Sequence, residues 1–176
     1  TENGNAITCW EANVVPGYEI KQLRANGTEE RNLSAAINPV AGKFYNITLN
    51  YNPGYTEVSE GNYTVDNEKG LKNLAKLVNN GETDIDITLT DDITLTGEWT
   101  PIGTSISNAY KGTFDGGGHT ISGLTVKGSD EYAGLFGYIG SGGTVKNVVL
   151  EDVQITSDNS SGYAGGVAGD SWGTIE

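Results

Sequence analysis

The sequence predicts a mainly β protein whose C-terminal part is a parallel β-helix (a solenoid), preceded by one capping helix and a small antiparallel, sandwich-like β segment. Three observations support this prediction. The chain has 26 glycines among 176 residues without a collagen-like period, which predicts frequent tight turns. Helical periodicity occurs in a single stretch after residue 66. Short sequences in the C-terminal half recur at intervals of roughly 24 to 31 residues, as they do in repeat proteins.

Residues 1–63 are predicted to form the small β-rich segment, with an Ig-like pattern. Their β-branched and aromatic residues alternate in part with polar ones at residues 7–10, 18–23 and 44–51. Turn sequences at residues 16–17, 26–27, 41–42 and 52–54 separate these stretches. The segment is short for a complete seven-stranded sandwich.

Residues 64–176 are predicted to hold the helix and the solenoid. Asp66 is a candidate N-cap, and Gly81 can end the helix in the left-handed conformation. Between them, one helical face is apolar (Leu71, Leu74, Ala75, Leu77 and Val78), and the opposite face carries Lys69, Lys72 and Lys76. This amphipathic helix is placed to cover the first coil.

The repeats then predict which residues stack. The sequence of residues 132–137 recurs at 163–169, and that of residues 143–146 recurs at 173–176. Residues 119–126 match residues 143–150 in their apolar positions, so Ile121, Val145 and Ile175 are expected in one column. Glycines 134, 137, 165 and 169 are expected at corners where a side chain would collide. Since a new strand begins just before Glu176, we expect either a fragment or an end that a partner caps.

These motifs resemble a known family. Residues 163–169 (YAGGVAG), followed by Gly173-Thr174-Ile175, resemble the GLUG motif of bacterial surface adhesins, and residues 91–103 and 112–121 look like the usual lead-in to such repeats. This resemblance covers residues 66–176 and implies a right-handed parallel β-helix on a cell-surface or secreted protein. Residues 42–49 resemble, less closely, the closing strands of fimbrillin-like pilus subunits.

Charge and composition exclude several classes of partner. The formal net charge of −13 disfavours nucleic acid and anionic lipid surfaces, because like charges repel. No apolar run is long enough to span a bilayer, so membrane insertion of this segment is not expected. The single cysteine, Cys9, allows no intrachain disulfide.

Catalytic, metal and cofactor sites are not expected. Asp115 beside His119 is the most suggestive pair for glycoside hydrolysis, but the sequence Asp-Gly-Gly-Gly-His also fits a turn capped by the aspartate. Asp84, Asp86, Asp91 and Asp92 lack the spacing of a known calcium motif. One histidine and one cysteine are too few for a zinc site.

Aromatic residues are the remaining candidates for ligand binding. Trp99 and Tyr110 flank an irregular stretch, residues 103–108, and are the predicted ligand contacts because loops on a rigid scaffold often bind. Tyr132 and Tyr163 occupy equivalent repeat positions and are expected to stack on each other as a structural ladder.

The sequence therefore predicts a non-enzymatic adhesin or pilus-associated module at the bacterial cell surface, either secreted, on the outer membrane or on a fimbria. Its expected partners are a glycan or a host surface protein, together with other pilus subunits. The alternative is a structural shaft or assembly subunit of a surface fibre, whose open β edge docks another subunit. A polysaccharide-degrading β-helix enzyme is the third interpretation.

Overall fold

The computed structural model describes residues 7–10, 20–25, 29–38, 40, 47–50, 52–128, 131–157 and 162–176. These residues fall into two compact units, which divide between residues 51 and 52. Strands β5 (Tyr55–Ser59) and β6 (Asn62–Val65) belong to the second unit and pair into its largest sheet, so this unit begins before residue 63.

The first unit contains two antiparallel pairs. One joins β1 (Ile7–Trp10) to β4 (Ile47–Asn50), and the other joins β2 (Ile20–Ala25) to β3 (Glu29–Ile37). The register of the second pair shifts between Ile20 and Gln22. The predicted turns at residues 16–17, 26–27 and 41–42 lie outside the described residues.

The predicted helix is confirmed as α1 (Glu68–Asn79). Its N-cap is Asn67 rather than Asp66, because the Asn67 side chain accepts a hydrogen bond from the Gly70 N–H at 2.9 Å and also donates to the Gly54 carbonyl at 2.7 Å. Asn80 is the C-cap of the helix, and Gly81 follows with φ of 115°. Its buried face consists of Gly70, Leu71, Leu74, Ala75 and Val78.

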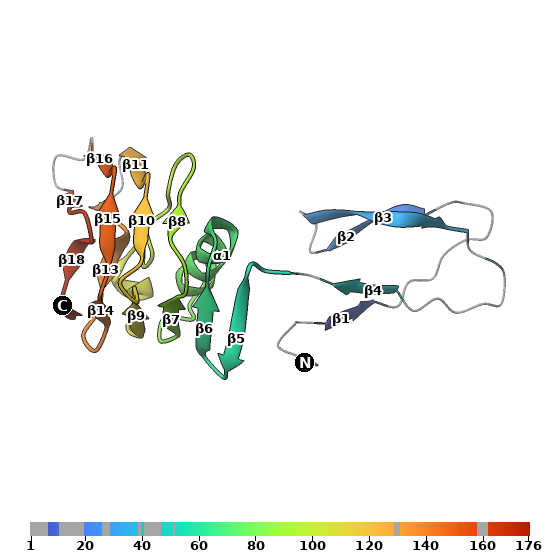
Figure 1. Ribbon diagram of the computed structural model, residues 1–176, viewed down its shortest axis with the longest axis horizontal. Coiled ribbons are helices and arrows are strands. Elements are labelled where there is room, and N and C mark those ends of the chain that lie inside the picture. Colours follow the sequence, from blue (N-terminus) through green and yellow to red (C-terminus); the bar gives the residue numbers. More distant parts are fainter. Residues whose placement is uncertain are drawn as a thin grey trace. The chain divides into compact units, whose positions relative to one another are not determined.

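The strands of the second unit are short and mostly parallel (Figure 1). A six-stranded sheet has the order β19-β14-β9-β7-β6-β5, in which only β5 and β6 pair in antiparallel fashion. Its strands are β5 (Tyr55–Ser59), β6 (Asn62–Val65), β7 (Asp86–Leu89), β9 (Thr113–Asp115), β14 (Thr144–Lys146) and β19 (Thr174–Ile175).

Four smaller parallel sheets complete this unit. A three-stranded sheet contains β8 (Ile93–Thr94), β10 (Thr120–Ser122) and β15 (Val149–Glu151). Three pairs follow: β11 (Thr125–Gly128) with β16 (Gln154–Ser157), β12 (Tyr132–Ala133) with β17 (Tyr163–Ala164), and β13 (Phe136–Ile139) with β18 (Ala168–Ser171). A 3₁₀ helix, η1 (Ile106–Asn108), lies in the irregular stretch between Trp99 and Tyr110.

The predicted right-handed parallel β-helix is therefore wrong. The described strands form several separate sheets of two or three strands and one mixed sheet, and no solenoid is found among them. Most parallel strands are only two to four residues long, and unpaired residues between them interrupt each hydrogen-bonded ladder. The observed fold class is mainly β, with small parallel sheets and one α-helix.

The repeat alignment predicts part of the register correctly. Tyr132 lies opposite Tyr163, and Val145 lies opposite Ile175. The single column of Ile121, Val145 and Ile175 is wrong, since Ile121 pairs with Leu150 in another sheet. In this register the corner at Gly116 lies directly against the corner at Asn147, since a Cβ at Gly116 would overlap the carbonyl of Asn147.

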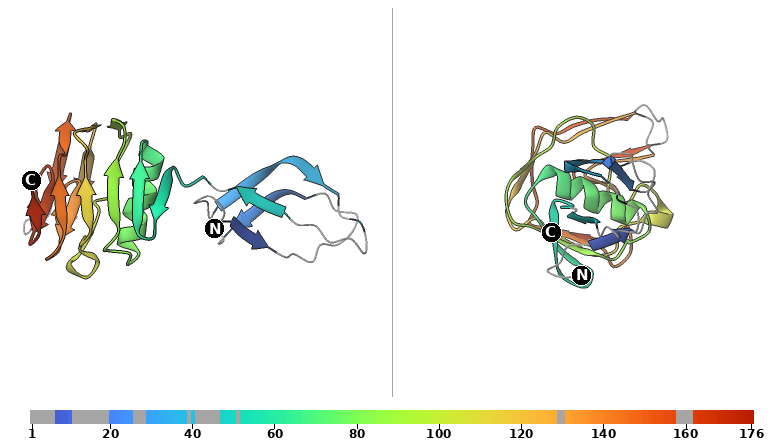
Figure 2. Two further views of the ribbon diagram at one scale, coloured as in Figure 1. Left: turned by 60° about the horizontal axis from the view of Figure 1, so that its bottom comes forward. Right: turned by 90° about the vertical axis from the view of Figure 1, so that its right-hand side faces the viewer.

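One hydrophobic core fills the second unit. The apolar face of α1 contributes Leu71, Leu74 and Val78, and the strands contribute side chains such as Ile87, Phe114, Ile121 and Phe136. Helix α1 lies beside β5 and β6 at one end of the unit, and the C-terminal strands lie at the other (Figures 1 and 2). Tyr132 and Tyr138 belong to a second, smaller cluster with Ala109.

Candidate functional site

A small groove runs between α1 and the segment that follows β8, and we call it the α1 groove. Its volume is about 190 Å³. Four of its lining residues recur on one helical face at spacings of three and four, and three consecutive residues form the opposite wall. The lining residues are Lys72, Ala75, Lys76, Asn79, Glu98, Trp99 and Thr100.

Side chains of α1 fix both ends of the opposite wall. At one end, the Glu68 carboxylate accepts hydrogen bonds from the Thr96 N–H at 2.6 Å and from its hydroxyl at 2.9 Å, while the Lys72 ammonium donates to the Thr96 carbonyl at 2.9 Å. At the other end, the Asn79 amide donates to the Pro101 carbonyl at 2.9 Å and accepts from the Gly103 N–H at 2.8 Å. These contacts fix the opposite wall of the groove relative to α1.

Glu68 is ionised over a wide pH range because of the same contacts. Partial burial opposes ionisation, but the hydrogen bonds from Lys72 and Thr96 outweigh it and lower the pKa of the Glu68 carboxyl. Glu68 and Lys72 also form an ion pair at 2.7 Å.

Trp99 and Tyr110, the predicted ligand contacts, are both buried. Trp99 is 2% exposed, and its indole N–H donates to the Leu135 carbonyl at 3.0 Å. Tyr110 is 0% exposed, and its hydroxyl donates to the Ile85 carbonyl at 2.9 Å. Both are therefore core residues with almost no surface open to a ligand, although Trp99 also borders the α1 groove.

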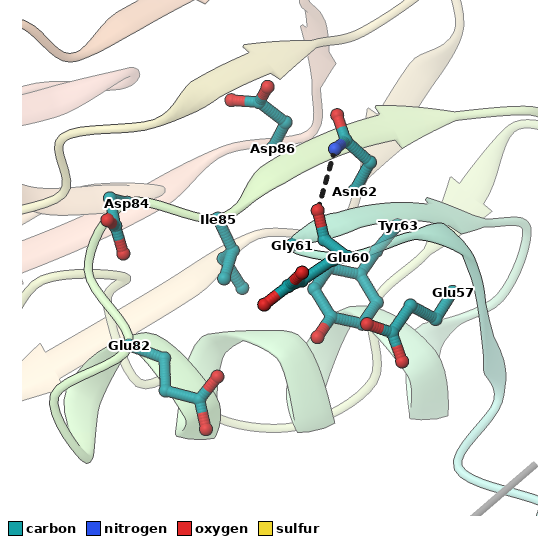
Figure 3. Close-up of a pocket in the computed structure, with 9 residues that line it drawn as sticks. All are labelled: Glu57, Glu60, Gly61, Asn62, Tyr63, Glu82, Asp84, Ile85 and Asp86. Carbon is teal, nitrogen blue, oxygen red and sulfur yellow. Dashed lines mark hydrogen bonds between the residues drawn. The ribbon is translucent and has the colours of Figure 1, made fainter. Parts of the chain in front are cut away.

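A second depression, which we call the acidic depression, lies where the β5–β6 hairpin meets the loop after α1 (Figure 3). Its volume is about 470 Å³. None of its lining residues is basic, so it attracts cationic groups electrostatically. They are Glu57, Glu60, Gly61, Asn62, Tyr63, Glu82, Asp84, Ile85 and Asp86.

The acidic depression changes the titration of Tyr63. Burial, followed by the charges of Glu57 and Glu82, raises the pKa of the Tyr63 hydroxyl to about 12. Burial also raises the pKa of Tyr132 and Tyr138, each near the Asp170 carboxylate.

Alkaline pH is therefore expected to destabilise the protein. A phenol whose folded pKa exceeds its unfolded value holds its proton longer in the folded state, so stability falls as pH rises from 10 to about 12. Tyr63 should account for about 2 kcal/mol of this fall. Denaturant titrations at pH 9 to 12 should show a smaller fall in Tyr63→Phe. The exposed Tyr163→Phe should match the unchanged protein, and equal falls in all three would contradict this assignment.

The four aspartates that invited a calcium site do not converge. Asp84 and Asp86 line the acidic depression, where Asp86 accepts a hydrogen bond from the Thr113 N–H at 2.7 Å. Asp91 accepts from the Asp92 N–H, and Asp92 accepts from the Thr120 N–H, both at 2.8 Å. Across the described parts of the chain, no three His, Cys, Asp or Glu side chains lie close enough to hold one metal ion.

Asp115 and His119 also have separate partners. The Asp115 carboxylate accepts hydrogen bonds from the Gly117 N–H at 2.9 Å and the Asn147 amide at 3.0 Å, and it lies 3.3 Å from the Lys146 ammonium. These contacts, led by that of Asn147, lower the pKa of Asp115. His119 lies 3.5 Å from Asp92 instead. Asp115 thus organises a turn, with Gly117 and Gly118 at positive φ, as the sequence predicts.

Asp115→Asn is expected to lower the free energy of unfolding by about 1 kcal/mol, because the hydrogen bonds lose the carboxylate's charge. The loss should be present at pH 7 and shrink at acidic pH, once the unchanged carboxyl is protonated in both states. Denaturation at pH 7 and pH 3 measures this. A loss that is the same at both pH values would mean that the charge has no part in the turn.

Among the aromatic side chains that the structure describes, the most exposed are Tyr163, which lies in a repeat, and Trp172, which lies between two repeats. Tyr163 stacks on Tyr132, with ring centroids 5.6 Å apart and planes 8° apart, which confirms the predicted ladder. Tyr163 is nevertheless 54% exposed, and Trp172 is 73% exposed. The repeat alignment identifies the position of Tyr163 but not its exposure.

Comparison with known proteins finds relatives of this chain. It is 35% identical over 136 residues to Halomucin of Haloquadratum walsbyi, a match that covers 69% of this chain. It is 32% identical over 123 residues to a protein of Evansella cellulosilytica described as a Gly-rich membrane protein, with 66% of this chain covered. The chain spans only 2% and 14% of the lengths of these two proteins.

No family model matches the chain, and no solved structure does. The names of the two relatives agree with the predicted cell-surface location in its broad form. Among the helical residues that the structure describes, none form a helix long and apolar enough to cross a membrane.

Proposed function

We propose that this chain is a binding module of a microbial cell-surface adhesin, and that it recognises a glycan or a surface protein without covalent chemistry. The α1 groove carries this proposal. Most of its lining residues are polar, its two buried lining residues are apolar, and hydrogen bonds from α1 fix the position of its opposite wall. Attachment to an outer membrane or fimbria, as the GLUG-like and fimbrillin-like motifs imply, is part of the same proposal.

The contacts of the Asp115 carboxylate support a non-catalytic role for this chain. Glycoside hydrolysis needs two carboxyl groups that flank one bond. Asp115 is occupied by turn contacts, and His119 pairs with Asp92 rather than with Asp115. The similarity to Halomucin and to a Gly-rich membrane protein supports a place in a much longer surface protein.

The experiment is a binding screen of the purified chain against mucin glycans, plant and host polysaccharides and matrix proteins. We expect saturable binding below millimolar concentration, with no new reducing ends from any polysaccharide. A correctly folded chain that binds none of them would refute the adhesin role. Turnover of a polysaccharide that is abolished by Asp115→Asn would support an enzyme instead.

A second candidate function, assembly into a fibre, is favoured by the C-terminal strands. Each of β15, β16, β17, β18 and β19 lies at the end of its sheet, where it can accept another strand. Apolar side chains are exposed there, including Val149 at 43% and Ile175 at 49%.

Sedimentation at increasing protein concentration tests the assembly role. Assembly predicts association that Ile175→Lys prevents, whereas Ile106→Lys, a matched change at an exposed residue of η1, leaves it intact. A chain that stays monomeric throughout would contradict assembly through these edges.

A further inference from the structure

The α1 groove also defines the chemistry of its ligand, on the basis of the binding role proposed above. We infer that it takes a single neutral sugar unit, such as a terminal residue of a glycan. Three properties of the groove support this inference: its size, its charge, and the kinds of polar group on its walls.

The groove is too small for an extended polymer segment. At about 190 Å³ it lies below the range of roughly 300–1,000 Å³ that is typical of drug-sized ligands. Its two most buried lining residues, Ala75 at 3% and Trp99 at 2% exposure, present almost no surface to a ligand. A volume of this size suits a single sugar ring that is contacted mainly by the polar lining residues.

The charges of the groove cancel, unlike those of the rest of the molecule. Lys72 is neutralised by its ion pair with Glu68, and the exposed Lys76 and Glu98 carry opposite charges. The whole chain has a net charge of −13, so an acidic sugar is repelled at long range and gains no compensating charge in the groove. A cationic ligand is attracted more strongly to the acidic depression than to this groove.

The walls offer both donors and acceptors of hydrogen bonds. The Lys76 ammonium donates, the Glu98 carboxylate accepts, and the Thr100 hydroxyl can do either. Each sugar hydroxyl is itself a donor and an acceptor, so this mixed set can satisfy neighbouring hydroxyl groups. Because α1 already fixes the backbone of residues 96–103, binding has to order only the exposed side chains that contact the sugar.

The test is a titration of the full chain with the methyl glycosides of glucose, galactose, mannose and N-acetylglucosamine, followed by saturation-transfer NMR. Glucuronic acid and N-acetylneuraminic acid serve as acidic comparators. We expect at least one neutral glycoside to bind in the millimolar range and the acidic sugars to bind more weakly. Glu98→Gln and Lys76→Gln should each weaken the binding about tenfold, as expected for a lost charge-assisted hydrogen bond.

Two matched substitutions serve as controls. Glu60→Gln in the acidic depression and Lys127→Gln on β11 make the same chemical changes at exposed positions outside the groove, and both should bind like the unchanged chain. Preference for acidic sugars, or binding that the groove variants leave unchanged, would overturn the inference. Binding to matrix proteins alone would overturn it too but leave the adhesin role intact, whereas no binding to any probe would remove both.

Discussion

Phe136→Ala is expected to lower the free energy of unfolding by about 4 kcal/mol, the range measured for large aromatic truncations in protein cores. Phe136 is 0% exposed. Its ring centroid lies 5.2 Å from that of Tyr110 and 5.2 Å from that of Phe114, so one ring links two neighbouring sheets. Removing the ring leaves a cavity. The backbone of residue 136 pairs with Ala168 on one side and with Ile102 on the other, so it cannot easily move to fill that cavity.

Chemical denaturation followed by circular dichroism measures this loss. Ile106→Ala, which truncates a side chain that is 65% exposed, is the control and should change stability by no more than about 0.5 kcal/mol. Similar losses in the two variants would mean that Phe136 does not occupy the centre of the core.

Gly70→Ala is expected to destabilise the protein by about 3 kcal/mol or more, although alanine is the better helix former by roughly 1 kcal/mol. Gly70 lies in the first turn of α1, against the Gly54 backbone. A Cβ at Gly70 would overlap the Gly54 carbonyl and approach the Val65 side chain to 2.7 Å. Because the overlap is with backbone, relief requires α1 to move away from the loop before β5.

Glycine can be required at a position either because a side chain would collide there or because the backbone has a positive φ. Thermal unfolding of Gly70→Ala and Gly142→Ala separates these two causes. Gly142 has φ of 96° and nothing within 4 Å of an added Cβ, so its replacement costs only the backbone strain of roughly 1–2 kcal/mol. If Gly70→Ala proved neutral or stabilising, the close approach of α1 to Gly54 would be incorrect.

The local elements of the second unit could be predicted from the sequence. Helix α1 follows from its apolar spacing, and the pairing of Tyr132 with Tyr163 follows from an identical repeat. The predicted N-cap, Asp66, lies one residue before the observed N-cap, Asn67, because both residue types are good helix caps. In the structure the Asn67 side chain caps the helix and also contacts the Gly54 carbonyl, a tertiary contact that the sequence does not reveal.

Long-range arrangement could not be predicted in the same way. Ile121 and Val145 occur in similar short motifs, but Ile121 pairs with Leu150 and Val145 pairs with Phe114 in a different sheet. The division into separate small sheets, in place of the predicted solenoid, depends on where each ladder stops, which apolar patterning does not encode.

The candidate site also depends on long-range contacts that the sequence does not predict. Trp99 and Tyr110 flank an irregular stretch of the sequence, and this position predicts that their side chains are exposed. In the structure both rings lie in the core, where they donate hydrogen bonds to the carbonyls of Leu135 and Ile85. Lys72 and Lys76 are identified by the sequence only as a polar helix face. They become groove residues because Asn79 and Glu68 fasten the 96–103 segment beside that face.

Mapping the bound glycan by NMR tests the central claim, that the chain binds its ligand non-covalently in the α1 groove. Backbone amide resonances of the full chain would be followed while a neutral oligosaccharide selected by the binding screen is added. The account predicts that the largest shifts occur at Lys76, Glu98 and Thr100, with little change at Glu60 and Asp84 in the acidic depression. Shifts confined to the acidic depression or to β17–β19 would contradict it.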